Sequence, residues 1–530
     1  MKDLFSRFER LNAVGASLSN ERNIDHLLEN ILLAAKAITH ADGGTLYRVS
    51  DDQKSLRFAI VRTDSLKIAF GGTTGAPISA KFNDLPLYRE NGEANNSLVA
   101  AYSAIHAETV NIADAYVAEG FDFSGTKNFD KTTGYRSQSF LTVPMRNHEN
   151  EVIGVLQLIN AIDQDTGAVR VFSDADQRLA ESLASQAAVA LTNRLLVSQL
   201  EELFEAFITL INLAIDEKSP YTGGHCQRVP SLTMMLAEAV DATTEGTLAG
   251  FTMSDKDRYE LKIAGLLHDC GKVTTPVHVV DKATKLQTIF DRITLLDTRF
   301  EVIRRDAELA MLRAVVAGED RAAAEQAWQK SLLAIDEDRN FLRRVNIGGE
   351  AMLPADQARV RLISQKYRWL DTERRDVEFL SEDELENLTI RAGTLTQAER
   401  ETINYHIVAT IKMLESLPWP KHLKHVAEYA GGHHERMDGK GYPKGLTRDE
   451  MSLQARIMGI ADIFEALTAR DRPYKPGMKL SEALGILGKF RDNGHIDPDL
   501  FDVFIKEKVY LRYAEQYLEA SQIDEPSNIL

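Results

Sequence analysis

The residues that most constrain the fold of this chain form a short polar loop at positions 433–443. The loop reads His-His-Glu-Arg-Met-Asp-Gly-Lys-Gly-Tyr-Pro, so two imidazoles and two carboxylates stand beside two glycines and a proline. Imidazole and carboxylate groups together suit borderline metals such as iron, manganese or zinc. Glycine and proline favour a tight and fixed turn, which a ligand-bearing loop needs. Since one such loop cannot complete a metal site, the fold must bring further ligands to it.

Candidate partners for the loop lie in segments that are far apart in the sequence. They are His225, His268, Asp269, His406 and Asp462. Asp462 interrupts an apolar stretch, and a carboxylate buried there would be costly without a metal or a cation beside it. Any one of the 13 histidines is more often an ordinary residue than a ligand. Together with His433 and His434, however, the set favours a metal site.

These segments together resemble the HD-GYP family, a branch of the HD metal-dependent phosphohydrolases. The resemblance covers roughly residues 205–285 and 394–515 and predicts an all-α bundle. Besides the histidines and aspartates above, the matching residues are Gly271, Lys272, Glu435, Asp438, Gly439, Gly441, Tyr442, Pro443, Arg472, Pro473 and Tyr474. The family hydrolyses cyclic di-GMP, a bacterial second messenger. The resemblance therefore implies a phosphodiesterase that opens the ring to linear pGpG, with further cleavage to GMP left open.

The resemblance also implies a centre of two divalent metal ions per subunit, with iron or manganese favoured. One ion would be held by His225, His268, Asp269 and Asp462, and the second by His406, His433 and His434, with Asp269 bridging the two. Asp269 and Lys272 are the expected catalytic residues. Lys272, Arg472 and Lys475 are expected to hold the anionic substrate.

Four positions depart from the pattern of the family. Some members bind a third metal through a glutamate four residues before the first histidine. Tyr221 stands there in this chain, which predicts two metals. Cys270 replaces an aliphatic residue, Ala409 a glycine, and Glu465 the aspartate of an Asp-Ala-Leu-Thr segment. We expect these three to be tolerated, Cys270 as a small buried hydrophobic residue.

Two alternative functions remain open at this point. The same fold could act on another nucleotide, such as 3′,3′-cyclic GMP-AMP or a ppGpp-like compound. The domain could instead be a non-catalytic module that senses a nucleotide and signals to a partner. Loss of ligands would favour the second alternative, and none is lost. Hydrolysis of cyclic di-GMP is therefore the principal hypothesis.

Composition predicts a multidomain cytoplasmic protein. A length of 530 residues predicts two or three domains, and 44% hydrophobic residues suffice for packed cores. Neither a signal-peptide stretch nor an apolar run long enough for a membrane span is expected. Cys226 and Cys270 are too few for a disulfide framework and suit a reducing compartment. The net charge of −17 argues against binding of nucleic acid polymers or anionic membranes.

The first 195 residues predict a sensor module of mixed α and β structure. A short amphipathic helix and a Ser/Asn-rich break are expected in residues 1–24, followed by a helix that begins at Asp25 as its N-cap. Period-two stretches then predict strands at residues 45–49, 56–60, 139–144 and 152–161. Residues 147–151 would turn the last two strands into a hairpin.

This region, over residues 20–195, resembles a GAF domain. Residues 129–136 resemble a segment of GAF domains that respond to cyclic nucleotides. A small purine ligand and a purely structural, dimerising role both remain open. Because the region has no cysteine, a bilin chromophore attached through a thioether is excluded.

A continuous helix is predicted from Asp176 to about Asp216. Apolar residues spaced four and three apart form a coiled-coil seam at Leu196, Leu200, Leu203, Phe207, Leu210 and Ala214. The seam predicts a parallel homodimer in which residues 196–216 carry a signal to the output domain at residues 217–530. Packing of the helix against its own domains is the alternative. Within the output domain, residues 286–392 predict an inserted helical hairpin whose role the sequence leaves open.

Overall fold

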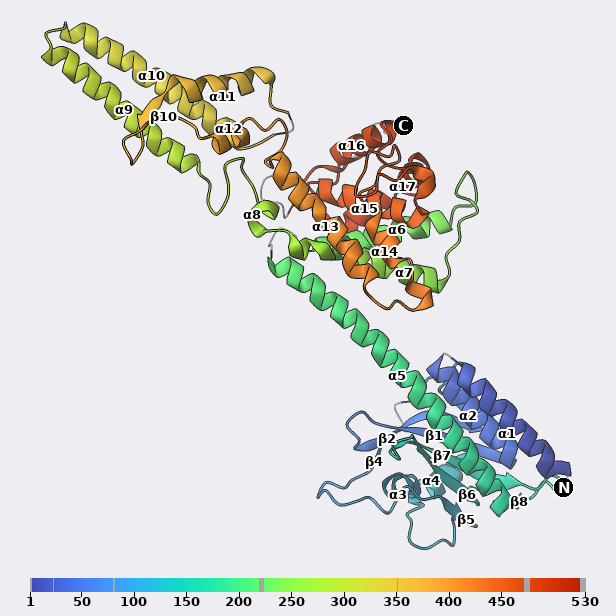
Figure 1. Cartoon of the computed structure of the whole chain (residues 1–530). Helices are drawn as coiled ribbons and strands as arrows, with labels where there is room; N and C mark the ends of the chain where they lie inside the picture. Colours follow the sequence, from blue (N-terminus) through green and yellow to red (C-terminus); the bar gives the residue numbers. More distant parts are fainter. Residues whose placement is uncertain are drawn as a thin grey trace. The chain divides into compact units, whose positions relative to one another are not determined.

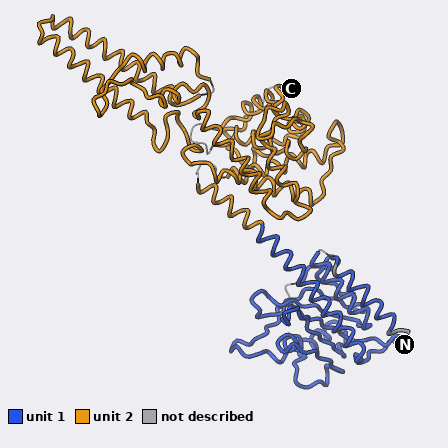
Figure 2. The backbone as a smooth tube through the Cα atoms, in the orientation of Figure 1, with its two compact units in different colours: residues 1–204 blue, residues 205–530 orange. Residues whose placement is uncertain are grey.

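The computed structural model describes the chain at residues 2–21, 23–79, 82–218, 224–349, 351–470 and 477–524. It divides into two compact units, residues 1–204 and 205–530, and the division falls within the long helix α5 (Asp174–Lys218; Figures 1 and 2). No helix among these described residues has the length and apolar character needed to cross a membrane. An α+β first unit and a predominantly helical second unit confirm the predicted fold class.

The first unit is built around an antiparallel sheet with the strand order β3-β2-β1-β7-β6-β5. The strands are β1 (Ala41–Val49), β2 (Ser55–Thr63), β3 (Ile68–Phe70), β4 (Leu85–Pro86), β5 (Val110–Ile112), β6 (Phe140–Arg146), β7 (Val152–Ile162) and β8 (Val169–Arg170). Strand β4 pairs with β2, and β8 pairs with β7. Strands β6 and β7 form the predicted hairpin, which is closed by a hydrogen bond from the Asn147 N–H to the Glu151 carbonyl (3.0 Å).

Helices cover both faces of this sheet (Figure 1). One face packs against α1 (Lys2–Asn20), α2 (Ile24–Thr39) and α5, and the other against α3 (Val99–His106) and α4 (Ser124–Thr133). Successive strand residues point to opposite faces. Leu46 and Leu156 accordingly join the cluster under α2 and α5, while Tyr47 and Val155 join the cluster under α3.

Two details of the N-terminal helices differ from the prediction. Helix α1 continues through the stretch predicted to break it, because Leu11 and Leu18 are buried in the core of the unit. Helix α2 is capped by Asn23 rather than by Asp25, since the Asn23 side chain accepts a hydrogen bond from the His26 N–H (3.0 Å). Asp25 lies in the first turn of α2, where its negative charge complements the helix dipole.

The second unit is a helical bundle with an insertion. Its bundle elements are α6 (His225–Asp241), α7 (Asp255–Leu267), η1 (Cys270–Thr274), α8 (Val277–Val280), α13 (Gln397–Glu415), η2 (Lys421–Leu423), α14 (Val426–Gly431), η3 (Arg448–Glu450), α15 (Leu453–Thr468), α16 (Leu480–Asp492), α17 (Pro498–Lys506) and α18 (Val509–Tyr517). Helix α6 packs against α7 and α15, and η1 packs against α13. These contacts bring the ends of α7 and α14 near one another.

The insertion contains more than the helical hairpin expected from the sequence. Helices α9 (Ile293–Val316) and α10 (Arg321–Asn346) are followed by α11 (Pro354–Lys366), the paired strands β9 (Arg368–Leu370) and β10 (Asp376–Glu378), and α12 (Glu382–Leu388). Phe300, Phe341 and Phe379 belong to a hydrophobic core confined to this segment. The insertion is therefore a small subdomain with packing of its own.

A buried ion pair joins α2 to the sheet of the first unit. Glu29 is 2% exposed, and its Oε1 lies 2.7 Å from Nη2 of Arg62. The same carboxylate accepts hydrogen bonds from the N–H and the hydroxyl of Thr73 (both 2.9 Å). Burial alone would raise the pKa of Glu29, but its hydrogen bonds with Thr74, Arg62 and Thr73 have the larger effect and lower this pKa to about 2. The carboxylate is thus ionised at neutral pH and satisfied by this network.

We predict that Glu29→Ala lowers the free energy of unfolding of the first unit by about 3 kcal/mol, because it leaves the Arg62 guanidinium buried without its anion. Urea denaturation of the full chain, with hydrogen exchange of β1 and β2 as the local probe, measures this loss. Glu149→Ala is the matched control, since Glu149 has a 65% exposed side chain in the same unit. Equal stability of both variants would contradict the prediction.

Candidate metal centre

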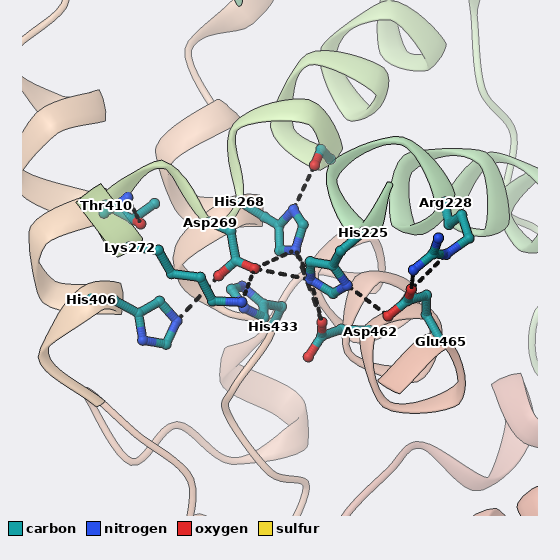
Figure 3. Close-up of polar contacts among 12 residues, drawn as sticks. His225, Arg228, His268, Asp269, Lys272, His406, Thr410, His433, Asp462 and Glu465 are labelled. Atoms are coloured by element: carbon teal, nitrogen blue, oxygen red, sulfur yellow. Dashed lines mark hydrogen bonds and ion pairs between the residues drawn. The ribbon is translucent and has the colours of Figure 1, made fainter. Parts of the chain in front are cut away.

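The histidines and aspartates singled out in the sequence converge inside the second unit (Figure 3). His225 begins α6, His268 and Asp269 lie between α7 and η1, and His406 lies on α13. His433 and His434 follow α14, and Asp462 lies on α15. His268 is fully buried, and Asp269 is 2% exposed. Residues up to 240 positions apart in the sequence thus meet at one place, as in the contact between His225 and Glu465.

A close approach between η1 and α13 brings Asp269 to His406. A Cβ atom on Gly271 would collide with the carbonyl oxygen of His406 and the backbone nitrogen of Thr410. Only glycine fits there, and its N–H donates to the Thr410 hydroxyl (2.9 Å). The Oδ1 atom of Asp269 consequently lies 3.3 Å from Nε2 of His406.

The Asp269 carboxylate lies between two groups of histidines. Its Oδ2 is 3.0 Å from Nε2 of His225 and 3.3 Å from Nε2 of His268. The Nζ atom of Lys272 lies 2.5 Å from the same oxygen. Its Oδ1, which faces His406, is buried without a hydrogen-bond partner among the described residues. The two oxygens of Asp269 therefore face different histidines, Oδ2 facing His225 and His268 and Oδ1 facing His406.

Donor atoms form three clusters in which all atoms lie within 4.8 Å of one another. The clusters are His406, His433 and His434; His225, His268 and Asp462; and His268, Asp269 and His433. Ring nitrogens of different histidines approach each other closely, such as Nε2 of His434 and Nε2 of His406 at 3.2 Å. Nε2 of His433 is buried with no hydrogen-bond partner in the described part of the chain. Such converging, unsatisfied donors fit divalent cations.

Hydrogen bonds from Nδ1 to backbone carbonyls orient three of the histidine rings so that Nε2 faces the centre. Nδ1 of His268 contacts the Gly265 carbonyl (2.6 Å), and the rings of His406 and His433 contact carbonyls three residues before them in the same way. A carbonyl can only accept, so Nδ1 carries the proton and Nε2 directs its lone pair inward. This is the outer arrangement that histidine ligands of metals normally have.

Burial and charge set the protonation states in the centre. Burial, followed by the charge of His268, lowers the pKa of His433 to about 4. Burial alone would raise the pKa of Asp462, but the charges of His225, His433 and His434 hold it below its usual value. Burial lowers the pKa of His225, but the charge of Glu465 raises it, to about 9. A neutral His433 beside an ionised Asp462 has the protonation states in which such groups bind metals, whereas His225 must lose its second ring proton to do so.

Only the two histidines of the 433–443 loop join the donor clusters. Glu435 instead accepts the backbone N–H groups of Lys444 (2.7 Å) and Leu446 (2.9 Å), so this carboxylate shapes the loop. A Cβ on Gly441 would collide with the backbone of Glu435, which explains the glycine. The Tyr442 ring stacks on His434 with centroids 4.8 Å apart.

The remaining loop residues have structural contacts. Asp438 forms a paired contact with Arg436, with distances of 3.0 and 2.8 Å. Gly439 has a φ of 74°, which side chains rarely adopt. Pro443 follows Tyr442 at the end of the turn. Arg472, Lys475 and Tyr221, which the sequence also singled out, lie outside the described residues.

Two residues beside this centre, Glu465 and Arg228, were not predicted from the sequence to support it. Glu465 is fully buried, and its Oε2 lies 2.6 Å from Nδ1 of His225. Arg228 donates from Nε to Oε1 of the same carboxylate (2.8 Å). The position of Glu465, three residues after Asp462 on an apolar helix, was the available signal, because residues three apart lie on one helix face.

Comparison with known proteins supports both domain assignments. Residues 23–191 match the GAF domain family, and residues 222–336 and 382–500 match HD domain families. The 3′3′-cGAMP-specific phosphodiesterase 1 of Vibrio cholerae is 41% identical over 102 residues, which cover 19% of this chain and 22% of the relative. A cyclic di-GMP phosphodiesterase of Pseudomonas aeruginosa is 37% identical over 116 residues, covering 22% and 27%. A cyclic di-GMP phosphodiesterase of Thermotoga maritima is 33% identical over 121 residues, covering 23% and 32%.

The chain thus spans about a third or less of the length of these curated relatives. Their names nevertheless describe hydrolases of cyclic dinucleotides, and their similarity agrees with the family resemblance in the sequence. An N-terminal region that matches a GAF domain is thus followed by a helical region that matches HD domains.

Proposed function

We propose that this protein is a metal-dependent cyclic di-GMP phosphodiesterase that produces pGpG and is regulated by its GAF domain. The observation that carries the proposal is the position of Asp269, whose two oxygens face two separate groups of buried histidines. A carboxylate in this position suits a bridge between two cations. Named relatives with this activity add support.

In this proposal, one divalent ion binds His225, His268, Asp269 and Asp462, and the other binds Asp269, His406, His433 and His434. Iron or manganese is the proposed identity, by family resemblance. Two bridged cations would supply a water nucleophile at neutral pH and neutralise charge on the phosphodiester. Lys272, held against Asp269, places a further positive charge where the transition state becomes more anionic.

The substrate is proposed to be an anionic cyclic dinucleotide. Because the chain has a net charge of −17, local cations must attract it, and Lys272, Arg472 and Lys475 are the proposed set. 3′,3′-Cyclic GMP-AMP is the second candidate, since a relative named for that substrate has 41% identity. A non-catalytic sensor is less well supported, because the complete donor set is retained. Two free buried cysteines, Cys226 and Cys270, support a cytoplasmic location.

A homodimer through residues 196–214 of α5 is part of the proposal. The side chains of the seam are exposed in the single chain, with Leu200 at 65% and Leu210 at 57%. Exposed apolar residues at heptad spacing favour a partner helix of the same kind. A parallel pair would place both GAF domains at the same end of the seam.

A small ligand in the GAF domain is also proposed. Gln157 lies on the central strand β7, yet it is only partly buried, on the sheet face covered by α3 and α4. Its amide nitrogen donates to the Thr142 hydroxyl (3.1 Å), and the Tyr47 hydroxyl donates to its amide oxygen (3.3 Å). These polar contacts lie between two apolar clusters of the unit. The ligand is proposed from the resemblance of residues 129–136 to a segment of GAF domains that respond to cyclic nucleotides.

Asp269→Ala is expected to lower turnover of cyclic di-GMP roughly a thousandfold or more and to reduce bound metal, because both cations lose their shared ligand. Anaerobic purification, metal analysis and product analysis measure the effect. Full metal content with an unchanged rate would refute the assignment of Asp269.

His434→Ala should leave about one metal ion per subunit, since His434 belongs only to the second group in this proposal. His278→Ala is the control, because His278 is exposed on α8 and lies outside the donor clusters. Metal stoichiometry by mass spectrometry decides the matter. Two ions retained in His434→Ala would exclude this residue as a ligand.

Leu203→Asp combined with Leu210→Asp is expected to convert the dimer into a monomer, as measured by light scattering. The added carboxylates would face each other across the seam. Ser198→Asp combined with Thr209→Asp adds the same charge off the seam and should leave the dimer intact. A monomeric wild-type chain would rule out the coiled coil.

A further inference from the structure

His225 differs from the other buried histidines of the centre in what holds its ring. The rings of His268, His406 and His433 each donate to a carbonyl three residues earlier. His225 is the first residue of α6, so its helix offers no preceding carbonyl. Its Nδ1 instead faces a side-chain carboxylate from another helix, Glu465 on α15 (Figure 3).

The carboxylate of Glu465 is fully occupied by two partners from α6. Its Oε2 lies 2.6 Å from Nδ1 of His225, and its Oε1 lies 2.8 Å from Nε and 2.7 Å from Nη2 of Arg228. Glu465 has no exposed surface, so an unpaired charge there would be strongly unfavourable. Arg228 lies about one helical turn after His225 and therefore approaches the carboxylate from the same side.

The glycine before His225 provides the space for this arginine. Gly224 has a φ of 86°, and a Cβ atom there would lie 2.5 Å from Nη1 of Arg228. The guanidinium occupies the volume that a side chain at position 224 would need. A methyl group at this position would force the Nη1 end of the guanidinium to move, and we expect this movement to disturb the contact with Glu465.

We propose that Gly224, Arg228 and Glu465 act together as positioning residues for the His225 ring. Glu465 accepts a hydrogen bond from Nδ1 of His225, which leaves Nε2 of the same ring facing Asp269 and Asp462. Arg228 holds the carboxylate in place through contacts from Nε and Nη2 to Oε1, and Gly224 leaves room for Arg228. The assembly would set the affinity of the metal site that contains His225. This inference rests on the metal assignment of the proposed function.

Glu465→Gln tests the role of the carboxylate. His225 and Arg228 face different oxygens of the carboxylate, and glutamine replaces one of these oxygens by an NH2 donor, so one of the two contacts is lost. We expect Mn²⁺ binding to the His225 site to weaken by about 10- to 100-fold, with the second site unchanged. Glu465→Asp keeps the charge and should restore most of the affinity. Unchanged Mn²⁺ affinity in Glu465→Gln, or no recovery in Glu465→Asp, would overturn the proposal.

Gly224→Ala tests the same assembly without altering a polar group. Gly246→Ala is its matched control, because Gly246 has a φ of 82° and a Cβ there meets nothing within 4 Å. Both variants place alanine at a similar positive φ, but only the Cβ of Gly224→Ala would meet Arg228. Only this variant should weaken Mn²⁺ binding, measured by titration of the metal-free full-length protein with circular dichroism as the check on folding. Equal loss in both variants, or no loss in either, would refute the inference.

The metal titrations need no substrate, so they separate this proposal from the proposed activity. If the wild type binds two Mn²⁺ ions and the variants behave as expected, but no cyclic dinucleotide is cleaved, the positioning role stands and the activity fails. If cyclic di-GMP is cleaved and Gly224→Ala binds Mn²⁺ like the wild type, the activity stands and the positioning role fails.

Discussion

The packing of Gly271 against α13 is the contact on which the candidate metal centre depends. No other residue fits beside the His406 carbonyl, and this close approach places Asp269 3.3 Å from the His406 ring. The two groups of histidines come from α6 and α7 on one side and from α13 and the 433–443 loop on the other. Asp269 is the side chain that faces both. A bulkier residue at position 271 would separate the two groups before any ligand changed.

The insertion interrupts the chain between these two groups without displacing them. Lys282 lies just before the insertion and is almost fully buried. Its Nζ donates hydrogen bonds to the side chains of Asn387 (2.7 Å) and Glu399 (2.7 Å). Glu399 also closes the capping box at the start of α13, two turns before His406. The contacts of Lys282 therefore hold the two ends of the insertion together beside the helical bundle. Because the ends are held together, the length of the intervening segment has little effect on the register of His406.

The candidate ligands could be selected from the sequence, but the residues that orient them could not. The family resemblance selected His225, His268 and Asp462 as ligands, and the structure brings their donor atoms into one cluster, while metal binding by them stays a prediction. The role of Glu465 depends on which way a buried side chain points across two helices, and a one-dimensional pattern does not contain that direction. The same limit applies to Glu435, which shapes its loop. At α2, both Asn23 and Asp25 are good capping residues, and the observed start of the helix decides between them.

The histidines also differ in whether backbone or side-chain groups orient their rings, and this difference is relevant to regulation. His268, His406 and His433 are oriented by backbone carbonyls, so their rings move only if the backbone moves. His225 is oriented by side chains and begins the first helix after α5. The end of α5 also reaches the centre, since Lys218 donates to the Lys272 and Val273 carbonyls in η1. We infer that a displacement of α5 would act first on η1 and on His225. Because a misplacement of about 1 Å can change a rate roughly a hundredfold, we expect even a small movement at these two points to change turnover.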